Sequence, residues 1–351
     1  MKKKYQNAFL IFGLIVLAIM VSQLNFKEVG EGISRAGYWF LAVVLLWLFL
    51  YCFNTTAWWL IIRSQECEGR AASRDESASG NDGCAEAFTI HSPLRNFLWL
   101  YKITVSGFAL NYATPGGLMG GEPYKIMSLS PRIGTERATS SVILHTMTHI
   151  FSHFWFWLLS CILYVAILPL NLPMGLLLAA VTAFCLAAIW FFLKGYKRGI
   201  AFSGMRLLSH IPFIKKWAAR FIESHQQQLH TIDMQIAALH GQSRGTFFCA
   251  VLLELACRIV SALEIFFILL VIMPSANYLH CILILAFTSL FANMLFFIPL
   301  QLGGREGGFL MSAGGLGMSA SAGIFVALLV RLRELIWTAI GLLLIKFDRK
   351  G

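Results

Sequence analysis

Eight stretches of this chain are apolar over lengths that match the hydrocarbon thickness of a lipid bilayer. A helix needs roughly 20 apolar residues to cross about 30 Å of hydrocarbon, and its backbone polar groups must be satisfied within the span. Hydrophobic residues make up 58% of the 351 residues and charged residues only 13%, which excludes a soluble globule. We therefore expect an all-α polytopic membrane protein with about eight spanning helices, near 8–24, 38–62, 97–113, 141–168, 173–193, 246–272, 279–298 and 320–345.

Two polar segments separate these apolar stretches. Residues 63–96 are rich in Ser, Gly, Ala and charge, which is typical of a flexible loop. Residues 194–245 combine many basic residues with apolar ones at helical spacing, as a helix in the headgroup layer does. A solvated helix that packs on the cytosolic face of the protein fits this segment equally well. We expect residues 1–351 to form a single integral membrane domain.

The positions of the basic residues predict the orientation of the chain. The net charge of +11 could indicate nucleic acid, but the basic residues lie at the ends of apolar stretches and in residues 194–245, which is typical of membrane orientation and anionic headgroups. The N-terminal stretch is long and lacks a small-x-small cleavage site, so we predict an uncleaved first helix. We expect a cell (inner) membrane protein with both polar segments and both termini in the cytosol, and no nucleic-acid partner.

This orientation requires two additional crossings. One must fall in TPGGLMGGEPYKIM, from Thr114, and the other in PLQLGGREGGFLM, from Pro299. Both stretches are too short and too polar for plain spans, so we predict two re-entrant or broken helices, whose non-helical backbone must be buried in protein or line a wet cavity. Both read P-x4-G-x-E. With insertion from opposite faces, this shared spacing indicates an inverted repeat.

The first stretch, TPGGLMGGEPYK, together with the later GGREGG, resembles the lysylphosphatidylglycerol synthase transmembrane-domain family of flippase-like integral membrane proteins. The resemblance extends over nearly the whole chain, although Leu300 and Gln301 follow Pro299 where the family usually has glycine. It implies a lipid-handling membrane domain. In the multiple peptide resistance factor, such a domain is joined to a soluble aminoacyl-transferase domain. Because this chain ends at Gly351, directly after the last apolar stretch, we expect no transferase domain here.

Charged residues beside the two breaks are the candidates for lipid binding, because ionisable groups at membrane depth are costly. The N-terminus of a broken helix binds phosphate well, and arginine matches phosphate oxygens with two donors. Alternatively, the glutamates only pair with buried basic residues and cap helix ends. The predicted lipid-binding residues are Pro115, Gly116, Gly117, Gly120, Gly121, Glu122, Lys125, Gly303, Gly304, Arg305, Glu306 and Arg331.

A second set of polar residues predicts a pathway inside the bundle. His145, His149 and His153 are spaced four apart and share one helix face. Glu254 and Arg258 are also four apart and can form an ion pair along their helix. Purely structural contacts are the alternative reading of both groups. Because the sequence contains no HExxH and the histidine triplet includes no carboxylate, we expect no metal site and no cofactor.

These patterns favour a membrane lipid-binding protein that translocates or presents a phospholipid or a lipid-linked phosphate headgroup. Walker A, HExxH, G-x-S-x-G and dinucleotide motifs are absent from the sequence, so we assign no catalytic residue. One alternative is a non-catalytic membrane partner of a separately encoded synthase or glycosyltransferase. Another is a membrane-embedded lipid transferase, in which Glu122 or a histidine of the triplet would act as general base.

Overall fold

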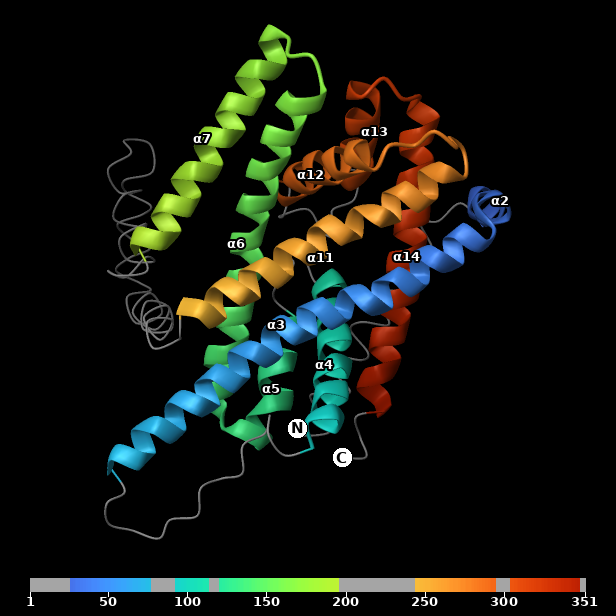
Figure 1. Cartoon of the computed structure of the whole chain (residues 1–351). Coiled ribbons are helices and arrows are strands. Elements are labelled where there is room, and N and C mark those ends of the chain that lie inside the picture. Colours follow the sequence, from blue (N-terminus) through green and yellow to red (C-terminus); the bar gives the residue numbers. More distant parts are fainter. Residues whose placement is uncertain (1–25, 77–91, 114–119, 196–243, 295–303, 348–351) are drawn as a thin grey trace, which may run out of the picture.

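A computed structural model of the chain describes residues 26–76, 92–113, 120–195, 244–294 and 304–347 (Figure 1). These residues form ten helices and no strand, so the predicted all-helical class is confirmed. The helices are α2 (Phe26–Ala36), α3 (Tyr38–Glu76), α4 (Pro93–Ala113), α5 (Gly121–Ile133), α6 (Thr135–Ile167), α7 (Leu172–Gly195), α11 (Arg244–Leu270), α12 (Tyr278–Met294), α13 (Gly304–Gly315) and α14 (Ala320–Phe347).

Among the helices that the structure describes, three are long and apolar enough to cross a membrane by themselves. They are α3 over Tyr38–Cys67, α6 over its whole length, and α7 over Leu172–Trp190. The shorter α12 is apolar over its 17 residues. Large apolar side chains such as Leu41 and Ile162 are exposed on these helices, as expected where the outer face of a bundle meets acyl chains that are as apolar as leucine.

The segment predicted to be a loop over residues 63–96 is helical at both ends, so that part of the prediction is wrong. The α3 helix continues to Glu76 and α4 begins at Pro93. Residues 63–76 contain several good helix formers and no proline, so the helix extends beyond its apolar part. Proline is favoured at the first helical position, as at Pro93. Residues 77–91, the predicted helix over 8–24 and nearly all of the 194–245 segment lie outside the described residues.

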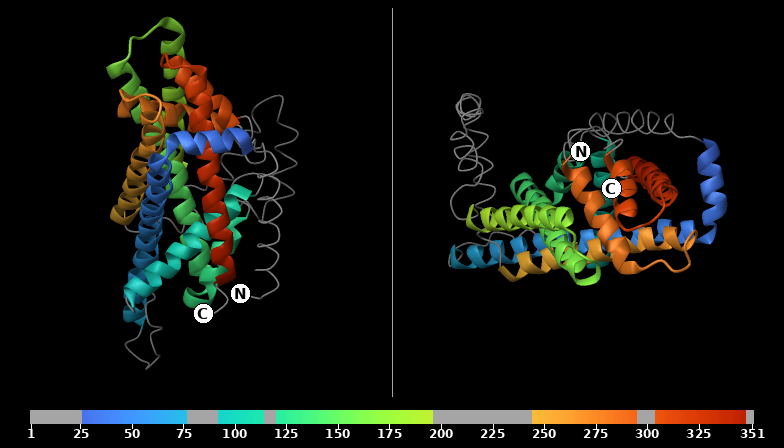
Figure 2. Two further views of the ribbon diagram at one scale, coloured as in Figure 1. Left: turned by 90° about the vertical axis from the view of Figure 1, so that its right-hand side faces the viewer. Right: turned by 90° about the horizontal axis from the view of Figure 1, so that it is seen from above.

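The short helix α2 was not predicted, because charged residues interrupt its apolar pattern. Gly37, whose φ is 51°, separates α2 from α3. In Figure 2, α2 lies across α14, which it contacts.

Two short helices, α5 and α13, lie where the sequence predicts broken segments. They contain 13 and 12 residues, and each has a glutamate in its first turn, Glu122 and Glu306 respectively. A negative charge there is favoured by the helix dipole. The α5 helix ends at Ile133 and is followed by Gly134, whose φ of 86° suits glycine at a helix end. In Figure 1, α5 leads down to the start of α6, whereas α13 leads up toward the start of α14.

Helices from the first and second halves of the chain interleave. The α3 helix packs along α11, α4 packs against α14, and α6 packs against α12. The α4 and α14 helices approach closely at Gly341, whose carbonyl oxygen accepts a 3.0 Å hydrogen bond from Ser106. Small residues at such crossings let membrane helices come together. This interleaving brings polar side chains from distant segments into one interior.

Candidate functional site

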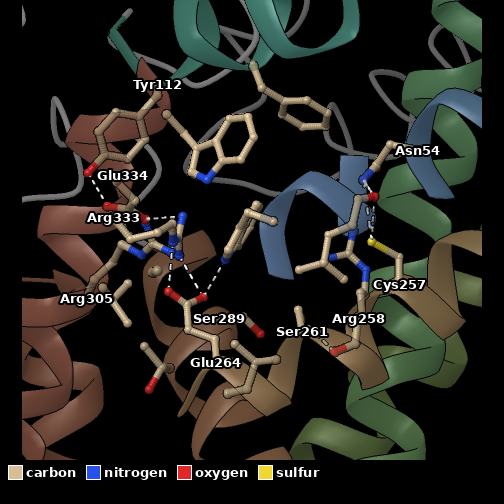
Figure 3. Close-up of a pocket in the computed structure, with 18 of the residues that line it drawn as sticks. Asn54, Tyr112, Cys257, Arg258, Ser261, Glu264, Ser289, Arg305, Arg333 and Glu334 are labelled. Carbon is tan, nitrogen blue, oxygen red and sulfur yellow. Dashed lines mark hydrogen bonds and ion pairs between the residues drawn. The ribbon is translucent and has the colours of Figure 1, made fainter. Parts of the chain in front are cut away.

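A cavity of about 330 Å³ lies inside the bundle, among α3, α4, α6, α11, α12, α13 and α14 (Figure 3). Aromatic side chains such as Trp47, Tyr51 and Phe108 form part of its wall. Ionisable groups inside a membrane bundle are costly and usually mark a functional site. The ionisable lining residues from α6, α11, α13 and α14 are His149, His153, Glu254, Arg258, Glu264, Arg305, Arg333 and Glu334.

One wall of the cavity contains a buried ion pair between α14 and α11. Arg333 binds Glu264 with two hydrogen bonds, of 2.7 Å to Oε1 and 2.8 Å to Oε2. Trp47 of α3 donates its indole N–H to Glu264 Oε2 over 2.9 Å. The centre of the guanidinium group also lies 3.8 Å from the centroid of the Trp47 ring. This two-pronged geometry connects three helices at one point.

A second network beside this ion pair joins the segments that flank the two breaks predicted from the sequence. Glu334 of α14 accepts hydrogen bonds from Arg305 of α13 and from the hydroxyl of Tyr112, near the end of α4. The same hydroxyl accepts from Arg331, which also binds Glu306 at 3.1 Å through Nε. Tyr112 precedes the first break, and Arg305 and Glu306 directly follow the second. The end of α4 and the start of α13 are therefore held together through α14.

Changing Tyr112 to phenylalanine should lower the free energy of unfolding by about 1.5 kcal/mol, since hydrogen bonds to two charged groups are lost while the Arg–Glu pairs remain. Thermal unfolding of the purified protein in detergent micelles measures this. Tyr38→Phe is the matched control, because Tyr38 is 72% exposed. Equal stability of the two variants would show that the bridging hydroxyl contributes nothing.

The histidine triplet contacts α11 rather than forming an isolated group. Glu254, which is 1% exposed, has Oε2 at 2.8 Å from His149 Nδ1 and Oε1 at 3.3 Å from His145 Nε2. His153 packs its ring against those of His149 and Trp157. No group of three His, Cys, Asp or Glu side chains in the described part of the chain could hold a metal ion.

The predicted ion pair between Glu254 and Arg258 does not form, so that prediction is wrong. Arg258 instead donates from Nε to Ser152 Oγ and from Nη2 to the carbonyl oxygen of His149, each at 2.9 Å. The packing of α6 against α11 supplies nearer partners to both side chains than they find along their own helix.

The charged pair at the first break lies apart from the cavity. Glu122 accepts hydrogen bonds from Asn111 at 3.0 Å, Lys125 at 3.3 Å and Thr146 at 3.0 Å. Lys125 is only 2% exposed, and its Nζ lies within cation–π distance of two aromatic rings, 5.6 Å from that of Trp58 and 5.2 Å from that of Phe108. These contacts match the structural alternative for Glu122.

The predicted site residues therefore separate into groups. Arg305 lines the cavity together with four of the pathway residues, His149, His153, Glu254 and Arg258. Glu306 and Arg331 lie in the ion-pair network beside it, and Gly120, Gly121 and Gly304 lie at the starts of the short helices. Outside the described residues lie Pro115, Gly116, Gly117 and Gly303.

Several cavity residues were not assigned to the site from sequence. The signal that selected Arg331 was charge within an apolar stretch. The same signal is present at Glu264, Arg333 and Glu334 and could have identified them. No comparable signal marked the aromatic and amide residues Trp47, Tyr112 and Asn54, because their side chains carry no charge.

Comparison with known proteins confirms the family resemblance that the sequence motifs predicted. Residues 7–341 match the family model described as the lysylphosphatidylglycerol synthase TM region. Neither the curated proteins nor the solved structures gave a match. Together with the apolar helices, the family match identifies a multi-pass membrane protein. Since the match spans nearly the whole sequence, this chain belongs to the lysylphosphatidylglycerol synthase transmembrane-region family.

Proposed function

We propose that this protein binds the polar headgroup of a membrane lipid in the cavity, and translocates or presents that lipid while its acyl chains stay in the bilayer. The observation that carries the proposal is a cavity of about 330 Å³, lined by charged side chains, inside a multi-pass membrane bundle. Its volume lies within the usual range of small-molecule sites. The lipid-related description of the family supports the same ligand class.

We further propose that the bundle consists of two inverted repeats, α3–α6 and α11–α14. In each, a short helix with a glutamate in its first turn is followed by a long helix. In this arrangement α3 corresponds to α11, α4 to α12, and α6 to α14. The contact between α4 and α14 then has its counterpart in the contact between α12 and α6, and the contact between α3 and α11 is its own counterpart. In Figure 1, α6 runs up and α14 runs down, which supports opposite orientations.

In this proposal, α5 and α13 are the re-entrant parts and enter from opposite faces of the membrane. Transporters built from inverted repeats bind their substrates where the repeats meet. The cavity receives side chains from both α3–α6 and α11–α14, which supports a binding site at that interface. We also propose that both termini lie on the cytosolic side of the cell membrane, because basic residues occur at both ends of the sequence.

Filling the cavity tests the proposal. Ser261 lines the cavity, so Ser261→Trp should slow the movement of a fluorescent phospholipid between the leaflets of proteoliposomes by about tenfold, as a barrier higher by about 1.4 kcal/mol would. The control is Ile162→Trp, at a position of α6 that is 61% exposed. If folded Ser261→Trp moves lipid as fast as wild type, the cavity is not the path.

The same preparation separates translocation from the two alternatives. A wild-type protein that binds lipid but does not move it would instead present the lipid to a separately encoded synthase or glycosyltransferase. Covalent change of the lipid, read by mass spectrometry, would indicate a transferase. We propose no catalytic step. Each cavity carboxylate contacts a basic group: Glu254 contacts His149, Glu264 contacts Arg333, and Glu334 contacts Arg305.

A further inference from the structure

Arg258 differs from the other two arginines of the cavity. Arg333 is paired with Glu264, and Arg305 is paired with Glu334. Among the described residues, no carboxylate oxygen lies within 4 Å of a guanidinium nitrogen of Arg258, whose contacts are to Ser152 and to a backbone carbonyl. Glu254 acts on Arg258 electrostatically without contacting it. A cation inside a membrane bundle is costly, and a bound anion would add a contacting negative charge.

The contacts of Arg258 hold its guanidinium group in a fixed orientation. Ser152 binds Nε and the His149 carbonyl oxygen binds Nη2, both on α6. In the part of the chain that the structure describes, Nη1 has no hydrogen-bond partner. Glu254, one turn earlier on α11, directs one oxygen to His149 and has the other 3.3 Å from His145. A planar guanidinium fixed in this way is well suited to the oxygens of a phosphate.

Two further polar atoms on the cavity lining are buried without a partner. Asn54 Oδ1 and His153 Nδ1 have no hydrogen bond within the described part of the chain, and Asn54 is only 5% exposed. Buried polar groups are nearly always satisfied in folded proteins. Asn54 also donates to Cys257, the residue before Arg258, at 3.4 Å. Figure 3 shows Asn54, Cys257 and Arg258 on one side of the cavity, across from Arg305 and Glu334.

We propose that Arg258 binds the phosphate of the lipid headgroup, with Asn54 and His153 forming hydrogen bonds to the same headgroup. This assignment rests on the proposed function and deepens it, because it names a lipid phosphate as the ligand class. It also replaces Lys125, Arg305 and Arg331 as phosphate contacts, since Lys125 and Arg331 do not line the cavity and all three are already paired with glutamates.

Binding of short-chain lipids to the purified protein in detergent micelles tests the proposal. The probes are dioctanoyl phosphatidic acid, dioctanoylglycerol, which lacks the phosphate, and inorganic phosphate. Wild type should bind phosphatidic acid about tenfold more tightly than the diacylglycerol. Arg258→Gln should remove this preference, and Arg258→Lys should retain part of it because the charge remains. The matched control is Arg137→Gln, an exposed arginine of α6, which should retain the full preference.

The possible outcomes separate this inference from the proposed function. If wild type binds both lipids equally, the phosphate assignment is wrong although lipid binding stands. If it binds neither, the proposed function fails as well. If inorganic phosphate binds as tightly as phosphatidic acid, the site is one for free phosphate and the lipid assignment is overturned.

A folding defect in Arg258→Gln, seen by circular dichroism and size-exclusion chromatography, would call for a second variant. Ser152→Ala releases the guanidinium from its Nε contact, so it should weaken the binding of phosphatidic acid severalfold and leave the binding of dioctanoylglycerol unchanged. Unchanged affinity for phosphatidic acid in this variant would overturn the proposal.

Discussion

Changing Arg333 to methionine should lower the free energy of unfolding by about 3–5 kcal/mol, because it would leave Glu264 as a buried charge without its ion-pair partner. Both side chains of this pair are about 5% exposed. Trp47 would remain as a hydrogen-bond donor to the carboxylate but does not neutralise its charge. Thermal unfolding of the purified variant in detergent micelles measures the change.

A double variant distinguishes loss of the pair from loss of packing. Combining Arg333→Met with Glu264→Gln removes the unpaired charge and keeps an oxygen that can accept from Trp47, so most of the lost stability should return. Removing both members of a buried ion pair is often nearly neutral. Arg63→Met, at an exposed position of α3, is the matched control. If the double variant is as unstable as Arg333→Met alone, packing of the arginine and not its charge explains the loss.

Local hydropathy was sufficient to predict most of the long helices. The stretches expected near 38–62, 141–168 and 320–345 correspond to α3, α6 and α14, with ends that differ by a few residues except at the polar extension of α3. Hydropathy did not predict that extension or α2. Polar helices are stabilised by helix-forming propensity and by packing contacts, and hydropathy measures neither of these. Glycines and prolines, which interrupt helices for reasons of backbone geometry, indicated from the sequence where the short helices α5 and α13 lie.

The composition of the cavity could be predicted only in part. Charge at membrane depth selected Arg305 and Arg258 from the sequence, and both line the cavity. Which residues meet could not be predicted, since Tyr112 and Glu334 are 222 positions apart and their contact depends on how α4 packs against α14. Glu122 carried the same signal, yet α5 directs it toward neighbours on α4 and α6 and not into the cavity.

The position of α5 depends on one glycine at its start, and its replacement should have a large effect. A Cβ atom at Gly121 would overlap the carbonyl oxygen of Gly107 and lie 2.6 Å from Asn111 Oδ1, both on α4. Asn111 Oδ1 also accepts the backbone N–H of Gly121 at 2.7 Å. Because a backbone atom cannot rotate away as a side chain can, Gly121→Ala should destabilise the protein by about 3 kcal/mol, the upper end of typical overpacking effects.

Gly314→Ala is the matched control for this change, because a Cβ atom at Gly314 of α13 would meet nothing within 4 Å. Alanine is favoured over glycine within helices, so this control should be neutral or stabilising by up to about 1 kcal/mol. Thermal unfolding in detergent micelles compares the two variants. Equal stability would mean that α5 does not pack closely on α4. In that case α5 would not hold Glu122 and Lys125 apart from the cavity. The reassignment of the phosphate contact to Arg258 partly depends on this separation and would lose that support.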